Sequence, residues 1–577
     1  MTLSIPANWP VMSVGDAHAR MTAPGMTFEL AEAVVRGVPL KVYKNAPPSA
    51  RFLLELTRFH GQGTFLVHRD ERISFEAHYR AAAALAVHLA ERCGVKKGDR
   101  VAVIMRNLPE WSVALFATLS IGAIAVPLNA WWTGEELEYG MRDSGARVAI
   151  ADEERASRLA PFTASLKLDA LIIARAEGAT TGAVRLEDIV GGPSAYAALP
   201  ERALPSAEIA PDDAATIFYT SGTTGKPKGA LGTHRNMMTN LVNSGMSAAR
   251  AALRRGDAWP APPPPGQRAG LVGIPFFHAT GCLSILVPAL AMGQKLVILP
   301  KWDAAEAMRL IEAEKINSFG GVPAIPWQVI EHPDFKKFDL SSVDSISYGG
   351  APAAGELPKR IKEAFPKVMP GTGYGMTETS AIATHCSGEE YLTHPETCGL
   401  PTPVSEIKIC DAAGKGLPVG AVGEIWVKGP QVVVGYWQKP EETAKSFKDG
   451  WVITGDIGKM DAEGYVYILD RAKDMLIRGG ENIYCVEVEN ALYQHPAVMD
   501  AAVVGIPHKV LGEEVGAVVQ IKPGMTASER ELQDHVAAHL ARFKVPVMIL
   551  VQNEPLPRNP NGKILKSELR RRFRPRG

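Results

Sequence analysis

The chain has 577 residues, of which 46% are hydrophobic and 21% are charged, a composition typical of a globular protein too long to fold around one core. Lys+Arg and Asp+Glu both number 62, so the formal net charge is zero. Because nucleic acids and anionic membranes attract an excess of positive charge, this balance gives no support to either kind of partner.

The cysteines and the apolar segments indicate the compartment. Cys93, Cys282, Cys386, Cys398, Cys410 and Cys485 lie far apart, without a Cys-x-x-Cys or a His at zinc spacing, so we expect reduced thiols in the cytoplasm. The N-terminus lacks a basic region followed by an apolar core, and we expect no signal peptide. The longest apolar tract, residues 113–128, is interrupted and short; it predicts a buried helix that runs into a buried strand, not an integral membrane segment.

The first half of the chain changes character near residue 50. Residues 1–50 show little periodicity and predict an N-terminal extension that wraps around the remainder. From Arg51 onward helices and strands alternate, and we expect helices at 75–92, 110–120 and 134–144 with strands at 100–105, 123–127 and 147–151. This βαβ order predicts parallel sheets that are covered by helices on both faces.

A glycine-rich segment follows a predicted strand at 214–218 and reads Tyr-Thr-Ser-Gly-Thr-Thr-Gly-Lys-Pro-Lys-Gly from residue 219 to residue 229. Its glycines allow a ligand to approach the backbone closely, and its hydroxyls and ammonium groups suit a polyphosphate. A flexible surface turn would not need so many donors. The predicted contacts are Thr220, Ser221, Gly222, Thr223, Thr224, Gly225, Lys226 and Lys228. The segment is not a Walker A loop, because Thr220 replaces its first glycine and Pro227 follows Lys226.

The alternation resumes after this loop, with helices expected at 234–246, 284–292 and 304–314 and strands at 269–274, 295–299, 318–321 and 345–349. The proline run within residues 257–267 predicts an exposed loop. Between 407 and 428 the strands become short and turn-rich, which is typical of a small β-barrel. Beyond residue 470 we expect a separate α+β domain, with helices at 486–493 and 528–540 and strands at 498–505, 515–521 and 547–551.

Five further segments carry candidate chemistry: Gly349-Gly-Ala-Pro352, Tyr374-Gly-Met-Thr-Glu378, Thr454-Gly-Asp456 followed by Arg471, Gly479-Gly-Glu-Asn482, and Lys563 in Pro560-Asn-Gly-Lys563. With the loop at 219–229 they resemble, in residue type and order, the motifs of the adenylate-forming superfamily. That superfamily comprises acyl-CoA synthetases, nonribosomal-peptide adenylation domains and beetle luciferases. The resemblance runs from about residue 50 to the end, and the chain is identified as a member of the acyl-CoA synthetases.

The resemblance implies the fold and the domains. It implies a large α/β domain of doubly wound, mostly parallel sheets with a small β-barrel-like subdomain, over residues 51–470. A small mobile α+β domain would follow over residues 471–577, with its hinge near residues 470–474 and Lys473 at the hinge position.

The resemblance also implies a role for each motif. Adenine would contact Gly350, Ala351, Pro352, Tyr374, Gly375 and Met376, and the α-phosphate would contact Thr377. Thr220 and Glu378 would hold Mg²⁺, which prefers oxygen ligands. Asp456 and Arg471 would bind the ribose, since an ionised Asp can accept both ribose hydroxyls. Gly479, Gly480 and Glu481 would line the pantetheine tunnel of coenzyme A. The implied catalytic residues are Lys563, Thr220, Glu378 and His278, and the cofactors are ATP, Mg²⁺ and coenzyme A.

The acid substrate is predicted from the segment 275–281, which in the family borders the acyl pocket. His278 stands about where amino-acid-activating relatives carry an acidic residue, which argues against an amino-acid substrate. The other expected wall positions are small or apolar: Gly320, Gly321, Val322, Gly350, Ala351 and Ala381. Such a pocket suits an apolar acid and does not determine its length.

The leading hypothesis is therefore a medium- or long-chain fatty acid–CoA ligase. The alternatives are an aryl or alicyclic acid–CoA ligase, a ligase that loads a carrier protein, a luciferase-like oxygenase, and a nucleotide sensor without turnover. The expected partners are the acid, ATP and coenzyme A, and a homodimer is left open.

Overall fold

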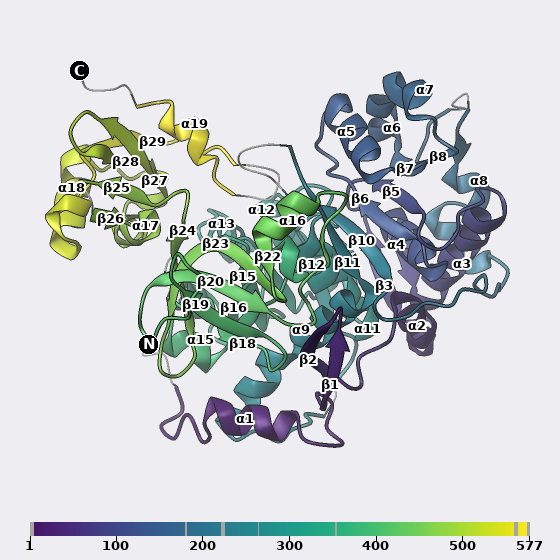
Figure 1. Ribbon diagram of the computed structural model, residues 1–577, viewed down its shortest axis with the longest axis horizontal. Helices are drawn as coiled ribbons and strands as arrows, with labels where there is room; N and C mark the ends of the chain where they lie inside the picture. Colours follow the sequence, from purple (N-terminus) through teal and green to yellow (C-terminus); the bar gives the residue numbers. More distant parts are fainter. Residues whose placement is uncertain are drawn as a thin grey trace.

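The structure is a computed structural model that describes residues 5–178, 182–220, 226–262, 265–351, 355–479, 481–558 and 563–573. It consists of a large α/β domain and a smaller C-terminal domain. Figure 1 shows the small domain at one end of the molecule, joined to the large one through β24 (Val466–Arg471), with α19 (Lys566–Arg570) extending back toward the large domain. The two domains also touch where Lys522 Nζ lies 4.0 Å from Glu331 Oε1.

Two large sheets organise the large domain. The first has the order β21 (Gly435–Tyr436), β11 (Gly229–Thr233), β10 (Ala214–Tyr219), β6 (Ile124–Pro127), β5 (Arg100–Ile104), β7 (Val148–Asp152), β8 (Ala170–Ala174) and β9 (Val184–Arg185). The second has the order β18 (Leu400–Pro401), β17 (Thr384–Ser387), β16 (Met369–Tyr374), β15 (Ser345–Gly349), β14 (Ser318–Gly321), β12 (Ala269–Val272), β13 (Lys295–Ile298), β3 (Thr64–His68) and β4 (Glu71–Ser74). The strands from β10 to β9 and from β16 to β3 are parallel, as predicted.

The main hydrophobic core lies between these sheets. It combines residues of β3, β5 and β13 with the helices α3 (Phe75–Glu91), α4 (Pro109–Ser120) and α9 (His234–Arg255). Every residue of α4 and of β6 is buried, which confirms the prediction for the apolar tract at 113–128. Among the described residues, no helix combines the length and the apolar character that a membrane crossing requires.

Other helices cover the sheets, and they include α5 (Gly134–Ser144), α6 (Glu153–Leu159), α12 (Ala304–Glu314), α13 (Ala324–Ile330) and α14 (Leu357–Ala364).

Two helical segments of the large domain differ from their expected bounds. Helix α9 continues nine residues past the predicted end and stops at Gly256, whose φ is +87°. The single helix expected at 284–292 is instead a π-helical turn, Cys282–Leu286, followed by α11 (Val287–Ala291). Pro288 has no N–H to donate to the carbonyl four residues earlier, so the regular pattern of helical hydrogen bonds is interrupted just before it.

The remaining sheets are antiparallel or mixed. The predicted small barrel is a five-stranded antiparallel sheet of β19 (Glu406–Cys410), β20 (Gly423–Lys428), β22 (Phe447–Lys448), β23 (Trp451–Met460) and β24. The small domain packs α17 (Cys485–Tyr493) and α18 (Glu529–His539) on the sheet of β25 (Leu476–Arg478), β26 (Glu481–Ile483), β27 (Val498–His508), β28 (Gly512–Ile521) and β29 (Met548–Gln552).

The N-terminal region has more regular structure than its sequence predicted. Helix α1 (Val14–Met21) and the hairpin of β1 (Leu30–Val35) and β2 (Val38–Tyr43) pack on the large domain. In Figure 1 these elements lie at the face of the molecule away from the small domain. Helix α2 (Ala50–Leu56) then leads toward β3 of the second sheet.

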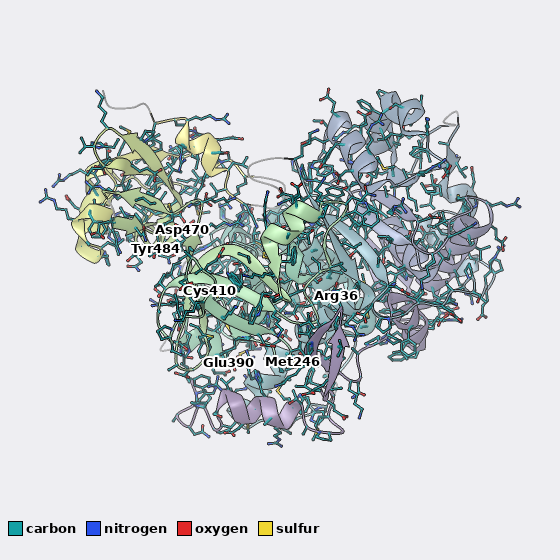
Figure 2. The ribbon with its side chains drawn as sticks, viewed as in Figure 1. Arg36, Met246, Glu390, Cys410, Asp470 and Tyr484 are labelled. Carbon is teal, nitrogen blue, oxygen red and sulfur yellow. The ribbon has the colours of Figure 1, made fainter. Side chains whose placement is uncertain are left out.

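A buried ion cluster joins α9 to α15 (Glu389–Thr393) beneath α1. Arg250 Nε lies 2.9 Å and Arg254 Nη1 lies 3.0 Å from Glu390 Oε1, and all three side chains are at most 2% exposed. Figure 2 places Glu390 beside Met246, between α1 and the antiparallel sheet. Burial alone would raise the pKa of Glu390, but the two guanidinium groups hold it below its usual value.

We expect Glu390→Gln to destabilise the large domain by about 3–5 kcal/mol, because two buried guanidinium groups lose their counter-charge. Since the pKa of Glu390 is lowered on folding, its contribution is present above the unfolded value and is lost as the pH falls through the folded value, below about 4.5. Urea unfolding at pH 7 and at pH 4 measures both effects. Glu306→Gln, which removes an exposed pair with Arg309, is the control and should change stability by less than about 1 kcal/mol. Equal effects of the two substitutions would contradict the prediction.

Candidate active site

The strands that flank the glycine-rich segment, β10 and β11, form an antiparallel hairpin. Tyr219 ends β10 and pairs with Gly229, the first residue of β11, and the Thr220 N–H donates to the Lys228 carbonyl (2.9 Å). The hairpin therefore differs from a Walker A loop, which joins a strand to a helix. Ser221, Gly222, Thr223, Thr224 and Gly225 lie outside the described residues, as do Pro352 and Gly480. Lys226 lies over the ring of Tyr139, with 5.0 Å from its Nζ to the ring centre.

Residues of two motifs that lie far apart in the sequence meet at Asp456. Its Oδ2 accepts a hydrogen bond from the Tyr374 hydroxyl (2.7 Å), and its Oδ1 accepts one from Arg471 Nε (3.1 Å). Tyr374 ends β16, Asp456 lies on β23, and Arg471 ends β24 directly opposite Asp456. Because a carboxylate offers about four lone pairs, Asp456 has acceptor capacity left for the hydroxyls of a ribose.

Glu378 lies close to this group in a buried position. It belongs to the short helical turn Thr377–Thr379 and is 6% exposed. Its Oε1 accepts a hydrogen bond from the Tyr436 hydroxyl (2.7 Å). Burial, and then the carboxylate of Glu378, raises the pKa of Tyr436. Lys228 Nζ lies 4.3 Å from the centre of the Tyr436 ring, so Tyr436 connects the hairpin to the buried carboxylate.

Lys563 of the small domain reaches this site of the large domain. Burial lowers the pKa of Lys563, the charge of Arg471 lowers it further, and Asp456 and Glu378 oppose the shift. Burial, with the charge of Lys563, also lowers the pKa of His278 to about 4, so the imidazole is neutral at pH 7. A single ammonium group therefore lies within electrostatic range of four predicted site residues.

Two family models match the chain: "AMP-binding enzyme" over residues 55–437 and "AMP-binding enzyme C-terminal domain" over residues 487–563. The chain belongs to the AMP-binding enzyme family. It is an acyl-CoA synthetase of the adenylate-forming superfamily, as its sequence predicted.

Curated relatives include ligases for several acids. The chain is 35% identical to a long-chain-fatty-acid–CoA ligase of Bacillus subtilis over 82% of its length and 86% of the relative. It is 34% identical to a feruloyl-CoA synthase of Amycolatopsis (89% and 97%), and 36% identical to a 2-succinylbenzoate–CoA ligase of Geobacillus kaustophilus (86% and 92%).

Solved structures agree on the fold. An anthranilate CoA ligase in complex with anthranoyl-AMP superposes with a TM-score of 0.80 at 26% identity, over 91% of this chain and 97% of that one. ATP-bound MatB from Rhodopseudomonas palustris gives a TM-score of 0.77 at 29% identity, over 91% and 99%.

The donor set of this acyl-CoA synthetase fits Mg²⁺. Glu378 supplies a buried carboxylate, and one of its oxygens accepts a hydrogen bond from the Tyr436 hydroxyl. Thr220, at the base of the hairpin, carries a hydroxyl. Among the described residues there is no group of three or more His, Cys, Asp or Glu side chains that could hold a metal. Mg²⁺ is commonly held by one or two carboxylates together with the substrate's phosphates, so this sparse arrangement is suitable.

Two glycines of the predicted site, Gly320 in the acyl-pocket wall and Gly375 among the adenine contacts, pack closely against neighbouring backbone. A Cβ at Gly320 would lie 1.8 Å from the Ser347 carbonyl oxygen, and one at Gly375 would lie 1.3 Å from that of Ala381. These residues are therefore required by close backbone packing, whatever lies in the pocket. Gly350, in contrast, has φ +75° and open space where a Cβ would be.

The segment predicted to line the pantetheine tunnel belongs to the small domain. Gly479 and Glu481 flank the β25–β26 turn, where the Gly479 N–H donates to the Leu511 carbonyl (2.8 Å). At the hinge position, burial and then the charge of Arg471 lower the pKa of Lys473 to about 8. From the same domain, Lys563 lies within electrostatic range of Asp456.

Tyr436 is a candidate residue that the sequence analysis missed, because Gly-Tyr-Trp alone is a weak signal. We expect Tyr436→Phe to lower kcat/KM by about tenfold, since a hydrogen bond to a charged group contributes about 1.5–3 kcal/mol. ATP-dependent pyrophosphate exchange measures the effect. Tyr467→Phe, which removes a hydroxyl on β24 that is bonded to Asp461, should leave exchange unchanged. A normal rate for Tyr436→Phe would show that Glu378 needs no support from the phenol.

Proposed function

We propose that this enzyme joins an apolar carboxylic acid to coenzyme A in two half-reactions. In the first, an oxygen of the acid's carboxylate attacks the α-phosphorus of ATP, and pyrophosphate leaves. In the second, the thiol sulfur of coenzyme A attacks the carbonyl carbon of the acyl-adenylate, AMP leaves, and the thiol proton is released. The observation that carries the proposal is the convergence of Tyr374 and Arg471 on Asp456, with Lys563 within electrostatic range of that group.

The side chains divide the first half-reaction between them. Asp456, held by Tyr374 and Arg471, would bind the ribose and so fix the α-phosphate in place. Lys563 would bridge the attacking carboxylate and the α-phosphate, which neutralises charge as the bond forms. Because a carboxylate is a weak nucleophile, its positioning also contributes to the rate. Bound Mg²⁺ would neutralise phosphate charge beside Glu378.

The second half-reaction would require Lys563 to withdraw. The small domain would rotate about the hinge at Lys473 and present the turn at Gly479 to the acyl group. Movement of a domain about a few hinge residues is a common way to separate two steps. Three points stay predictions: the domain boundaries at residues 50 and 470–474, a cytoplasmic location, and a homodimer.

The acid is proposed to be a medium- or long-chain fatty acid, with an aryl or alicyclic acid as the alternative. The relatives named above act on fatty, feruloyl and succinylbenzoyl groups, so similarity alone leaves both classes open. Two features favour an acid without a second charge. His278 is neutral at pH 7, and Phe277 packs edge-on against Trp131, with 5.1 Å between ring centres.

The experiment is a substrate panel on the full-length protein. Pyrophosphate and AMP release are measured with octanoate, palmitate, cinnamate, benzoate and phenylalanine, each with and without coenzyme A. Coenzyme-A-dependent AMP release with palmitate or octanoate supports the proposal. Release with cinnamate or benzoate alone favours the aryl alternative, and exchange without acceptance of coenzyme A favours transfer to a carrier protein. Turnover with phenylalanine, or none with any acid, contradicts the proposal.

A further inference from the structure

Lys563 lies in the segment 557–565, and the two ends of this segment are joined to each other through backbone contacts. The Leu565 N–H donates to the Pro557 carbonyl (2.8 Å), and Arg558 faces Ile564 in an antiparallel bridge. These contacts bring the two ends of the segment together, so the position of Lys563 depends on how these ends are attached to the small domain.

The upstream end is attached through Arg558. Its guanidinium pairs with Asp500, whose Oδ1 accepts a hydrogen bond from the Tyr493 hydroxyl (2.6 Å). Asp500 is 8% exposed, so water competes little for this pair. The upstream end of the segment is thereby fixed to β27.

The downstream end is attached through Lys566, three residues after Lys563. Lys566 Nζ lies 2.7 Å from Glu489 Oε1 on α17, and the same oxygen accepts the Val503 N–H (2.8 Å). Lys566 also lies within electrostatic range of Asp470. The Lys566 ammonium group is therefore paired with one carboxylate and influenced by the charge of a second.

Asp470 places this cluster at the hinge. It precedes Arg471 at the end of β24, and its carboxylate accepts the N–H groups of Arg471 and of Cys485 in the small domain. Figure 2 shows Asp470 and Tyr484 at the junction of the two domains. Asp470 is 2% exposed, and burial raises its pKa to about 6, while Lys566 opposes the shift.

We propose that Lys566, together with Glu489 and the hinge residue Asp470, forms a positioning cluster that fixes Lys563 for the first half-reaction and has no role in the second. The proposal rests on the proposed function, in which Lys563 acts only in the first half-reaction. The position of Lys563 matters because a misplacement of a reacting group by about 1 Å can reduce a rate by about 100-fold. An exposed lysine on an unattached segment would sample a much larger volume.

The test is Lys566→Met in the full-length protein. Pyrophosphate exchange with the most active acid of the panel reports the first half-reaction, and thioester formation from the adenylate of that acid and coenzyme A reports the second. We expect exchange to fall by about tenfold or more through kcat, with the KM for ATP nearly unchanged, and the second half-reaction to stay within about twofold. Lys566→Arg keeps the charge and should retain most of the exchange rate.

Further variants separate positioning from folding. Glu489→Gln keeps an acceptor for the Val503 N–H and removes the charge, and it should behave like Lys566→Met. The double variant should be no worse than either single variant, because the two residues act as a pair. Lys544→Met is the matched control: it removes another ion pair on α17, with Glu487 at 2.6 Å, and should leave both half-reactions unchanged.

Chemical labelling of Lys563 gives a readout that does not depend on turnover. An amine-reactive acetylating reagent is added to the ligand-free protein, and mass spectrometry measures the rate at which Lys563 is modified. We expect Lys566→Met, and not Lys544→Met, to raise this rate several-fold. If wild-type protein exchanges no pyrophosphate with any acid but the labelling responds as expected, the proposed function fails and the positioning cluster stands. Equal loss of both half-reactions, unchanged exchange, or unchanged labelling overturns the inference.

Discussion

Lys563→Ala is expected to lower pyrophosphate exchange by about 1000-fold or more, which corresponds to about 4 kcal/mol of transition-state stabilisation. The residue is the small-domain cation that lies within range of Arg471, Asp456 and Glu378. Its loss leaves the charge that develops between the carboxylate and the α-phosphate uncompensated in a largely buried site.

The same variant should form thioester from a supplied acyl-adenylate at nearly the wild-type rate, because the adenylate bond that Lys563 helps to form already exists. Stopped assays of the two half-reactions on one preparation provide the comparison. Arg530→Ala, at a small-domain side chain that is 82% exposed, should leave both rates unchanged. If Lys563→Ala slowed both half-reactions equally, the separation into two arrangements of the small domain would be wrong.

Glu378→Gln is expected to lower pyrophosphate exchange by about 100-fold and to shift its Mg²⁺ dependence to higher concentrations. The substitution removes a negative charge, while the amide oxygen can still accept the hydrogen bond from Tyr436. A carboxylate is a much better ligand for a hard cation than an amide is. The loss should therefore come from the metal and not from the packing of the helical turn.

The measurement is exchange as a function of free Mg²⁺, with thermal unfolding as a check on folding. Glu389→Gln provides a control, because Glu389 is also 6% exposed and pairs with Arg255, away from the hairpin. An unchanged Mg²⁺ dependence in Glu378→Gln would assign Glu378 a structural role and would remove it from the proposed metal site.

Local patterns in the sequence determined the class of the fold and the identity of the motifs. The alternation of helices and strands predicted the parallel sheets, because side-chain periodicity is set within each element. The resemblance of the motifs identified the superfamily, which the family models confirmed. The π-helical turn before Pro288 and the regular elements of the N-terminal region were not predicted, since the first depends on one missing N–H and the second on packing against α9.

Only the tertiary structure brought the motifs together. Tyr374 and Asp456 are 82 residues apart in the sequence, and Tyr436 is 58 residues from Glu378. The sequence alone predicted a polyphosphate-binding loop at 219–229, candidate carboxylates at Glu378 and Asp456, and a late lysine. The folded chain decided that Tyr436 donates a hydrogen bond to Glu378, that Lys563 lies within electrostatic range of Asp456 and Glu378, and that Lys566 pairs with Glu489. The physical reason is that periodicity and turn chemistry act over a few residues, whereas contacts between distant side chains depend on how whole sheets and domains pack.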